Sequence, residues 1–232
     1  MCAVVLLYGW HFIQLIKGYR ELTNNSKIER SISHLQTLYS VVAGLALTVA
    51  ILTIIDDELT IPIRSETFPY FFAFLVTLVP FYHGALRHLD FTYIEAPSAE
   101  TKPGALMADW SFLFIESCLF LAAASLLQRP ESFSYVFASI FAFDVIWGVG
   151  AYLAFSPKSS KLIPEVKWVI INLITFVILV LVYIYLHSIE GTQKPVDTYR
   201  WTTVLTIAIA RSIWDYAWCW EYYKPSIEQQ SH

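Results

Sequence analysis

The sequence predicts an all-α protein, a bundle of transmembrane helices with seven spans, or six if the first helix lies in the membrane interface. Hydrophobic residues make up 56% of the 232 residues and charged residues only 15%, whereas soluble domains have about 25% charged residues. Several apolar stretches reach roughly 18 or more residues, which is long enough to cross a bilayer. The remaining segments are too short for a separate soluble domain, so a single membrane domain is expected over residues 1–232.

The hydrophobic pattern places the spans at 3–16, 35–55, 68–86, 109–127, 133–155, 166–186 and 200–220. The first span is short, because about 14 residues cover about 21 Å of a hydrocarbon core of about 30 Å. His11 and Gln14 share one of its faces, so a helix lying in the interface is the alternative. Pro80 is expected to kink the third span just before His83. Asp109 is expected to cap the beginning of the fourth.

Basic residues are distributed unequally between the two predicted sides of the membrane. Ten Lys and Arg residues fall on the side of the loop 87–108 and the C-terminus, and four fall on the other side. Because cytoplasmic loops carry an excess of Lys and Arg, this loop and the C-terminus are predicted to be cytoplasmic. The N-terminus would lie outside with seven spans and inside with six. An aromatic belt is expected near the inner boundary, formed by Trp110, Trp168, Trp218, Trp220, Tyr222 and Tyr223.

The last span carries two charged residues, Arg211 and Asp215, inside its apolar run. They are four residues apart, so on a helix they share a face and can pair. A charge at mid-bilayer costs roughly 2.5–3.5 kcal/mol even on the most lenient scale, so such residues normally face a bundle interior or a wet cavity. The pair therefore indicates either a functional site or a polar contact that fixes helix packing.

Four other spans place polar residues at similar depths. Counted from the predicted cytoplasmic boundary, the depths run from about 7 Å for His83 to about 18 Å for Asp144. We therefore predict one cytoplasm-facing pocket for a ligand or ion, lined by Arg211, Asp215, Asp144, Glu116, His83 and Asn172. Arg87 and Asp90 continue the stripe of His83 and are predicted to form the pocket mouth, where the planar arginine fork could read an anion. The alternative for this stripe is a cap that meets water and lipid headgroups.

The predicted pocket holds more acids than bases. Three carboxylates share it with Arg211, and an unpaired carboxylate in a low dielectric tends to become neutral. We expect Arg211 to pair with Asp215 or Asp144, which leaves at least one acid with a mobile proton. His83 could exchange that proton with water.

Metal, cofactor and nucleic-acid sites are not predicted. His11, His83 and His88 are the candidate metal ligands, but no HxxxH or HExxH spacing joins them. The three cysteines lack CxxC spacing, and no block of Lys and Arg suggests nucleic acid. No cofactor is expected. No GxSxG motif is present either, so the catalytic residues of an enzyme would be unknown.

Three functions remain open. The chain could be a transporter, channel subunit or sensor whose pocket binds an ion, a proton or a small anionic or protonatable ligand. It could be an integral-membrane enzyme that uses Asp or Glu with His83 as acid–base groups on a lipid. It could also be a structural subunit of a larger membrane assembly, whose polar residues hold helices together. The expected partners are the lipid bilayer and either a second copy or a membrane partner subunit.

Overall fold

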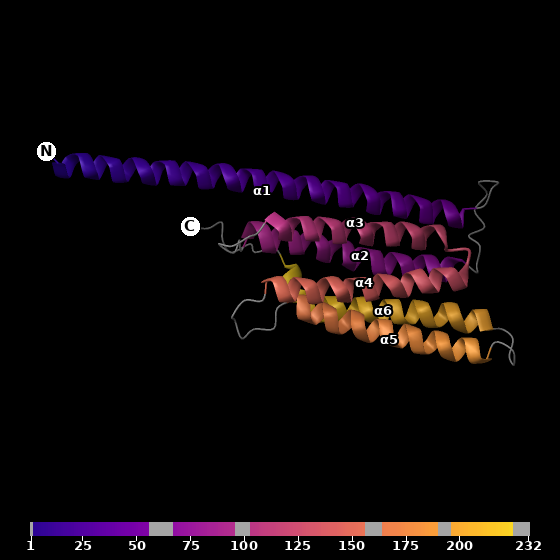
Figure 1. Cartoon of the computed structure of the whole chain (residues 1–232). Coiled ribbons are helices and arrows are strands. Elements are labelled where there is room, and N and C mark those ends of the chain that lie inside the picture. The colour runs from indigo at the N-terminus through magenta and orange to yellow at the C-terminus, as the bar shows by residue number, and fades with distance from the viewer. Residues whose placement is uncertain (1, 56–66, 96–102, 156–163, 190–195, 225–232) are drawn as a thin grey trace.

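The computed structural model describes residues 2–55, 67–95, 103–155, 164–189 and 196–224, and all regular structure in these ranges is helical. The all-α prediction is therefore confirmed. The helices are α1 (Cys2–Ile54), α2 (Phe68–Asp90), α3 (Pro103–Ser125), α4 (Pro130–Phe155), α5 (Pro164–Ile189) and α6 (Val196–Tyr223), and a π-helix, η1 (Phe91–Glu95), continues α2. They form one bundle, with α1 on the side opposite to α5 and its N-terminal part protruding (Figure 1).

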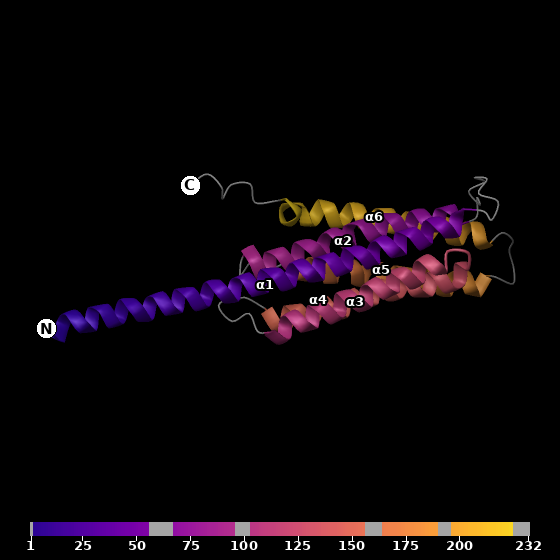
Figure 2. The same cartoon turned by 90° about the horizontal axis from the view of Figure 1, so that it is seen from above.

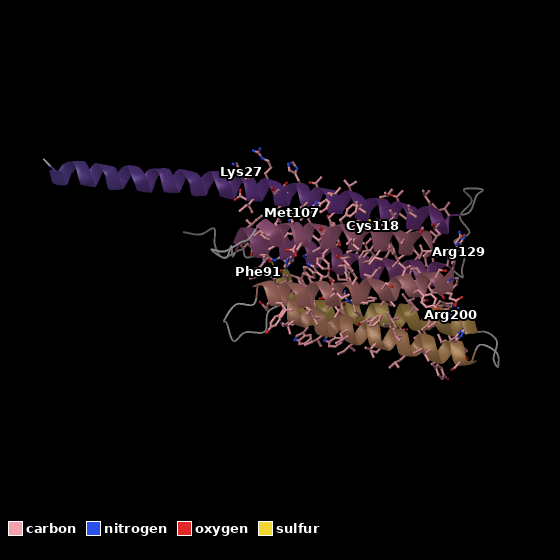
Figure 3. The ribbon with its side chains drawn as sticks, viewed as in Figure 1. Lys27, Phe91, Met107, Cys118, Arg129 and Arg200 are labelled. Carbon is pink, nitrogen blue, oxygen red and sulfur yellow. The ribbon has the colours of Figure 1, made fainter. Side chains whose placement is uncertain are left out.

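In the part of the chain that the structure describes, five helical segments are long and apolar enough to cross a membrane: Lys27–Ile54, Phe68–Glu95, Gly104–Ser125, Pro130–Leu153 and Val166–Ser188. Large apolar side chains are exposed along them, including Ile146 at 62% and Leu153 at 75%. Such side chains are suited to contact lipid. The side chains extend from all sides of the bundle, between an end marked by Phe91 and Met107 and an end marked by Arg129 and Arg200 (Figure 3). These features indicate an integral membrane protein.

The prediction of seven spans is not confirmed. Residues 3–16 and 35–54 belong to one continuous helix of 53 residues, so 3–16 form neither a separate span nor a separate interfacial helix. The polar stretch 17–34 contains no proline, the residue that most strongly interrupts a helix, and its polarity does not end the helix. A helix of this length measures about 80 Å, against a hydrocarbon core of about 30 Å. Its part Lys27–Ile54 is long and apolar enough to cross a membrane.

The sixth helix, α6, is not one of the five apolar segments, yet it belongs to the bundle. It packs against α2 and α5 and also contacts α4, and Figure 2 shows it beside α2. Three of its charged residues, Arg200, Arg211 and Asp215, lie on the buried face, since each is at most 6% exposed. This burial explains why a helix with so polar a sequence can be part of a membrane bundle.

Prolines mark the beginnings of several helices. Pro103, Pro130 and Pro164 are the first residues of α3, α4 and α5, and a proline at this position loses no intrahelical hydrogen bond. Because α3 begins at Pro103, Asp109 lies inside the helix and the prediction that it caps the N-terminus is wrong. The predicted loop 87–108 is also shorter than expected, since α2 and η1 continue to Glu95.

Pro80 interrupts the hydrogen bonding of α2, and α6 compensates for it. Proline has no N–H, so the carbonyl oxygen of Val76, four residues earlier, loses its usual donor. The hydroxyl of Ser212 on α6 lies 2.6 Å from this oxygen and 2.9 Å from the carbonyl oxygen of Ala208 in its own helix. Ser212 thus supplies the donor that the proline removes and joins α2 to α6 beside Arg211.

Replacing Ser212 with alanine is expected to lower the free energy of unfolding by about 1–3 kcal/mol, because the carbonyl of Val76 is left without a donor in the bundle interior. The loss should be smaller in a Pro80→Ala background, where the backbone N–H of residue 80 is restored. Reversible unfolding in mixed micelles measures both values. Thr206→Ala is the control, since this hydroxyl donates only to the carbonyl of Thr202 within α6. Equal losses in both backgrounds would contradict the compensation.

Candidate functional site

A polar cavity lies inside the bundle, between α2, α3, α4, α5 and α6. The volume of the cavity that the centre of a water molecule can occupy is about 20 Å³. One water needs about 10–15 Å³ of such volume, so the cavity has room for one or two waters. The polar residues that line it include five of the six predicted pocket residues, namely Glu116, Asp144, Asn172, Arg211 and Asp215. The remaining wall is mostly aromatic and apolar. The structure thus brings these five residues together, while their role in binding stays a prediction.

Arg211 is the centre of a hydrogen-bonded chain that joins three helices. Its Nε donates to Oδ1 of Asn172 at 3.1 Å, and Nδ2 of Asn172 donates to a carboxylate oxygen of Asp144. Its Nη1 lies 3.1 Å from Oδ2 of Asp215, an ion pair that lacks the angles of a hydrogen bond. The guanidinium also stacks 4.4 Å from the centre of the Phe81 ring, a favourable cation–π contact. The predicted pairing with Asp215 is present, and Asp144 is reached through Asn172.

Two aromatic residues complete the partners of Asp215. Its Oδ1 accepts a hydrogen bond from Nε1 of Trp168 at 3.2 Å and from the hydroxyl of Tyr223 at 3.1 Å. Both residues are only 5% exposed, so their assignment to an aromatic belt at the membrane interface is wrong. Trp168 precedes Asn172 by four residues, a spacing that puts both on one face of α5. The sequence could therefore have predicted that Trp168 faces the bundle interior, because it shares a helix face with the polar residue Asn172.

Gly84 allows the two rings to lie against α2. A Cβ atom at this position would lie 3.3 Å from the hydroxyl oxygen of Tyr223 and 3.5 Å from Cζ2 of Trp168. The 3.5 Å contact is ordinary, but the 3.3 Å contact would require the Tyr223 hydroxyl to shift by a few tenths of an ångström, so glycine suits the position well. Tyr223 and Trp168 consequently form part of the cavity wall.

Glu116 has a carboxylate oxygen without a hydrogen bond among the described residues, as does Asp215, whose Oδ2 lies beside Arg211. The side chain of Glu116 is 6% exposed, and its Oε1 has no hydrogen-bond partner among the described residues. The carboxylate interacts electrostatically with Asp144 and Arg211. Three carboxylates and one guanidinium line the described cavity. If all four groups were ionised, the negative charges would exceed the positive charge by two, which is costly in a buried site.

His83, the sixth predicted pocket residue, does not line the cavity. Its Nδ1 lies 3.4 Å from the hydroxyl of Tyr216, and its ring centre lies 4.6 Å from that of Tyr223. Since Tyr223 contacts both His83 and Asp215, this tyrosine connects the histidine to the cavity. A depth estimate from the sequence could not distinguish a residue that lines the cavity from one, such as His83, that lies beside it. Depth gives the position along a helix but not the position around its axis.

Arg87 and Asp90, predicted to form the mouth, are bound to other parts of the chain and do not line the cavity. The guanidinium of Arg87 is paired with both carboxylate oxygens of Glu95, and its Nε donates to the carbonyl oxygen of Tyr222 at 2.8 Å. Asp90 accepts a hydrogen bond of 2.8 Å from Nε2 of Gln36 on α1. The arginine fork that could read an anion is therefore occupied by Glu95.

A second buried carboxylate was missed as a site residue. Asp109 is 3% exposed, and its oxygens accept hydrogen bonds from the hydroxyl of Tyr93 at 2.7 Å and Nε1 of Trp147 at 3.0 Å. Nε2 of His88 lies 3.2 Å from the same carboxylate. Tyr93 falls within the predicted loop 87–108 but is buried in η1. The signal was the seven-residue spacing from Asp109 to Glu116, which places both acids on one face of α3.

No family model, curated protein or solved structure matches this chain. The interpretation of its function therefore depends on the geometry of the cavity.

Proposed function

We propose that this chain is an integral membrane protein that binds a proton or a small cation in the cavity of its helix bundle, as a transporter, channel subunit or sensor. One observation carries the proposal: carboxylates outnumber cationic side chains in a buried site, among the residues that the structure describes. Buried like charges repel strongly in a low dielectric, so the site is stabilised when a positive charge enters it. An anionic ligand would have the opposite effect.

The size of the cavity favours this function over an enzyme that acts on lipids. About 20 Å³ of space for water centres suits a proton or a single small ion and has no room for a lipid headgroup. The groups around Arg211 could also serve only to hold helices together. Glu116 makes no such helix-joining hydrogen bond through Oε1 among the described residues, and this free oxygen favours a binding site over a scaffold.

We also propose that the end of the bundle near Asp90 faces the cytoplasm. Because α1 is continuous, its N-terminal half extends from the end at which α6 terminates (Figure 1). The basic residues of 17–30 therefore lie on the same side of the membrane as the C-terminal end of α6. That side then holds the same excess of Lys and Arg as in the topology predicted from the sequence. On this proposal both termini are cytoplasmic.

Asp144→Asn is expected to lower the affinity of the site for a proton or cation by about tenfold or more, which corresponds to about 1.4 kcal/mol or more of lost binding energy. The protein is reconstituted in liposomes, and proton or Na⁺ movement under an imposed gradient is followed with pH- and Na⁺-sensitive dyes. For a sensor, the readout is the shift of the melting temperature with pH or with Na⁺ in place of choline.

Glu131→Gln is the matched control, because this carboxylate is exposed at the first turn of α4 and accepts its hydrogen bond from Tyr183. It should leave flux and thermal shifts unchanged. Wild-type protein that shows neither ion movement nor a thermal shift with pH or cation would contradict the proposal.

A further inference from the structure

Glu116 and Asp144 are two carboxylates from different helices, α3 and α4, that line one cavity. They interact electrostatically with each other, and both are at most 9% exposed. Two carboxylates in one dry site cannot readily be ionised together, and the usual solution is that they hold one proton between them. The oxygen of Glu116 without a partner among the described residues is available to carry that proton.

We infer that Glu116 and Asp144 share one exchangeable proton, and that this proton, with one or two waters, is the ligand of the cavity. The inference rests on the proposed function and gives the ligand its chemical identity. When the proton leaves, the O–H bond of the carboxyl breaks and a cavity water becomes hydronium, while the carboxylate keeps the electron pair. Uptake is the reverse reaction.

The oxygen atoms around the cavity suit a proton better than a metal cation. Hard cations such as Mg²⁺ and Ca²⁺ require about six to eight oxygen ligands. Oδ1 of Asn172 is bonded to Arg211, and Oδ1 of Asp215 accepts from Trp168 and Tyr223. One oxygen of Asp144 accepts from Asn172. A proton needs only a single free carboxylate oxygen, which Glu116 provides.

The charged and titratable groups around the pair come from three helices, α1, α2 and α6. Arg211 is the closest cation and is shared with Asp215, so it does not neutralise both remaining acids. α5 contributes the uncharged amide of Asn172. The groups that act on one or both carboxyls are Tyr39 of α1, His88 of α2, and Arg211 and Asp215 of α6. Tyr39 is itself buried, and its hydroxyl has no hydrogen-bond partner among the described residues, but it lines a separate small pocket and not the cavity of the pair.

Infrared difference spectroscopy of the whole protein in lipid nanodiscs tests the inference. Spectra are recorded over a pH titration, in H₂O and D₂O, for wild type, Glu116→Gln, Asp144→Asn and the control Glu131→Gln. We expect one protonated-carboxyl band that shifts in D₂O and is lost as the pH rises. The band should be absent from Glu116→Gln, altered in frequency in Asp144→Asn and unchanged in Glu131→Gln. A band that persists unchanged in Glu116→Gln, or the absence of any such band, would overturn the inference.

Two further arms keep the result decisive. Wild-type protein containing ¹³C-carboxyl glutamate needs no substitution, and its band should shift to lower frequency; a band that does not shift overturns the assignment to Glu116.

Replacing choline chloride by NaCl at constant pH should leave the band in place. If Na⁺ removes it, the ligand is a sodium ion and the proton assignment fails, while the proposed function, tested by flux and thermal shift, still stands.

Discussion

Arg211→Met is expected to lower the free energy of unfolding by about 3–5 kcal/mol, the usual cost of removing one partner from a buried ion pair. The substitution removes the only cation that lines the described part of the cavity and leaves three carboxylates there. It also removes the donor to Asn172 and the stacking contact with Phe81. Methionine keeps an unbranched side chain of similar length, so the loss reports mainly on charge and hydrogen bonding. Reversible unfolding in mixed micelles measures it.

Lys224→Met provides the control on the same helix end. Lys224 pairs with Glu221 at 3.1 Å, but their side chains are 50% and 86% exposed. An exposed pair of this kind typically contributes between about 0 and 1 kcal/mol, so the control should change stability little. If Arg211→Met were no more destabilising than Lys224→Met, the buried network would not exist as described.

Asp109→Ala is expected to destabilise the protein by about 3 kcal/mol or more, since each buried donor left without an acceptor costs about 1–3 kcal/mol. The carboxylate accepts from Tyr93 and Trp147 and pairs with His88, groups that belong to η1, α4 and α2. Asp109→Asn keeps one acceptor oxygen and should lose less. Trp147 also lines the cavity, so its release should disturb the position of the neighbouring Asp144.

The same unfolding assay applied to Asp90→Ala supplies the comparison for Asp109. Gln36 donates a hydrogen bond to Asp90 in a partly exposed position, so the loss of this carboxylate should cost only about 1 kcal/mol. Equal effects of Asp90→Ala and Asp109→Ala would show that the three donors do not depend on Asp109.

The residues that line the cavity were largely predictable, because a charged residue in an apolar span normally faces the bundle interior or a water-filled cavity. Exposure of a charged side chain to lipid costs several kcal/mol, so charged residues in a span are expected to face the bundle interior. This applies to Arg211, Asp215, Asp144 and Glu116, and their similar depths along the spans placed them in one layer. His83 fitted the same layer but lies behind Tyr223. Depth alone does not give the position around a helix axis, and only packing against neighbouring helices determines it.

The aromatic donors and the long first helix could not be predicted in the same way. Tryptophan and tyrosine near the end of a span suit the membrane interface as well as the interior, since their rings are apolar and their N–H or O–H groups polar. Trp168 and Tyr223 turn inward because Asp215 needs donors. For α1, hydropathy marks a part that is apolar enough to cross the membrane, but it does not mark where the helix ends. The polar residues 17–34 contain no proline.

The central claim is that polar side chains from separate helices face one another across a shared cavity. A double-mutant cycle between Arg211→Met and Glu116→Gln measures this directly, because the two residues are far apart in the chain and can couple only through space. We predict a coupling of about 0.5–3 kcal/mol, as found for residues in one buried network. The same cycle with Glu131→Gln should be additive. Additivity of Arg211 and Glu116 within about 0.5 kcal/mol would contradict the claim.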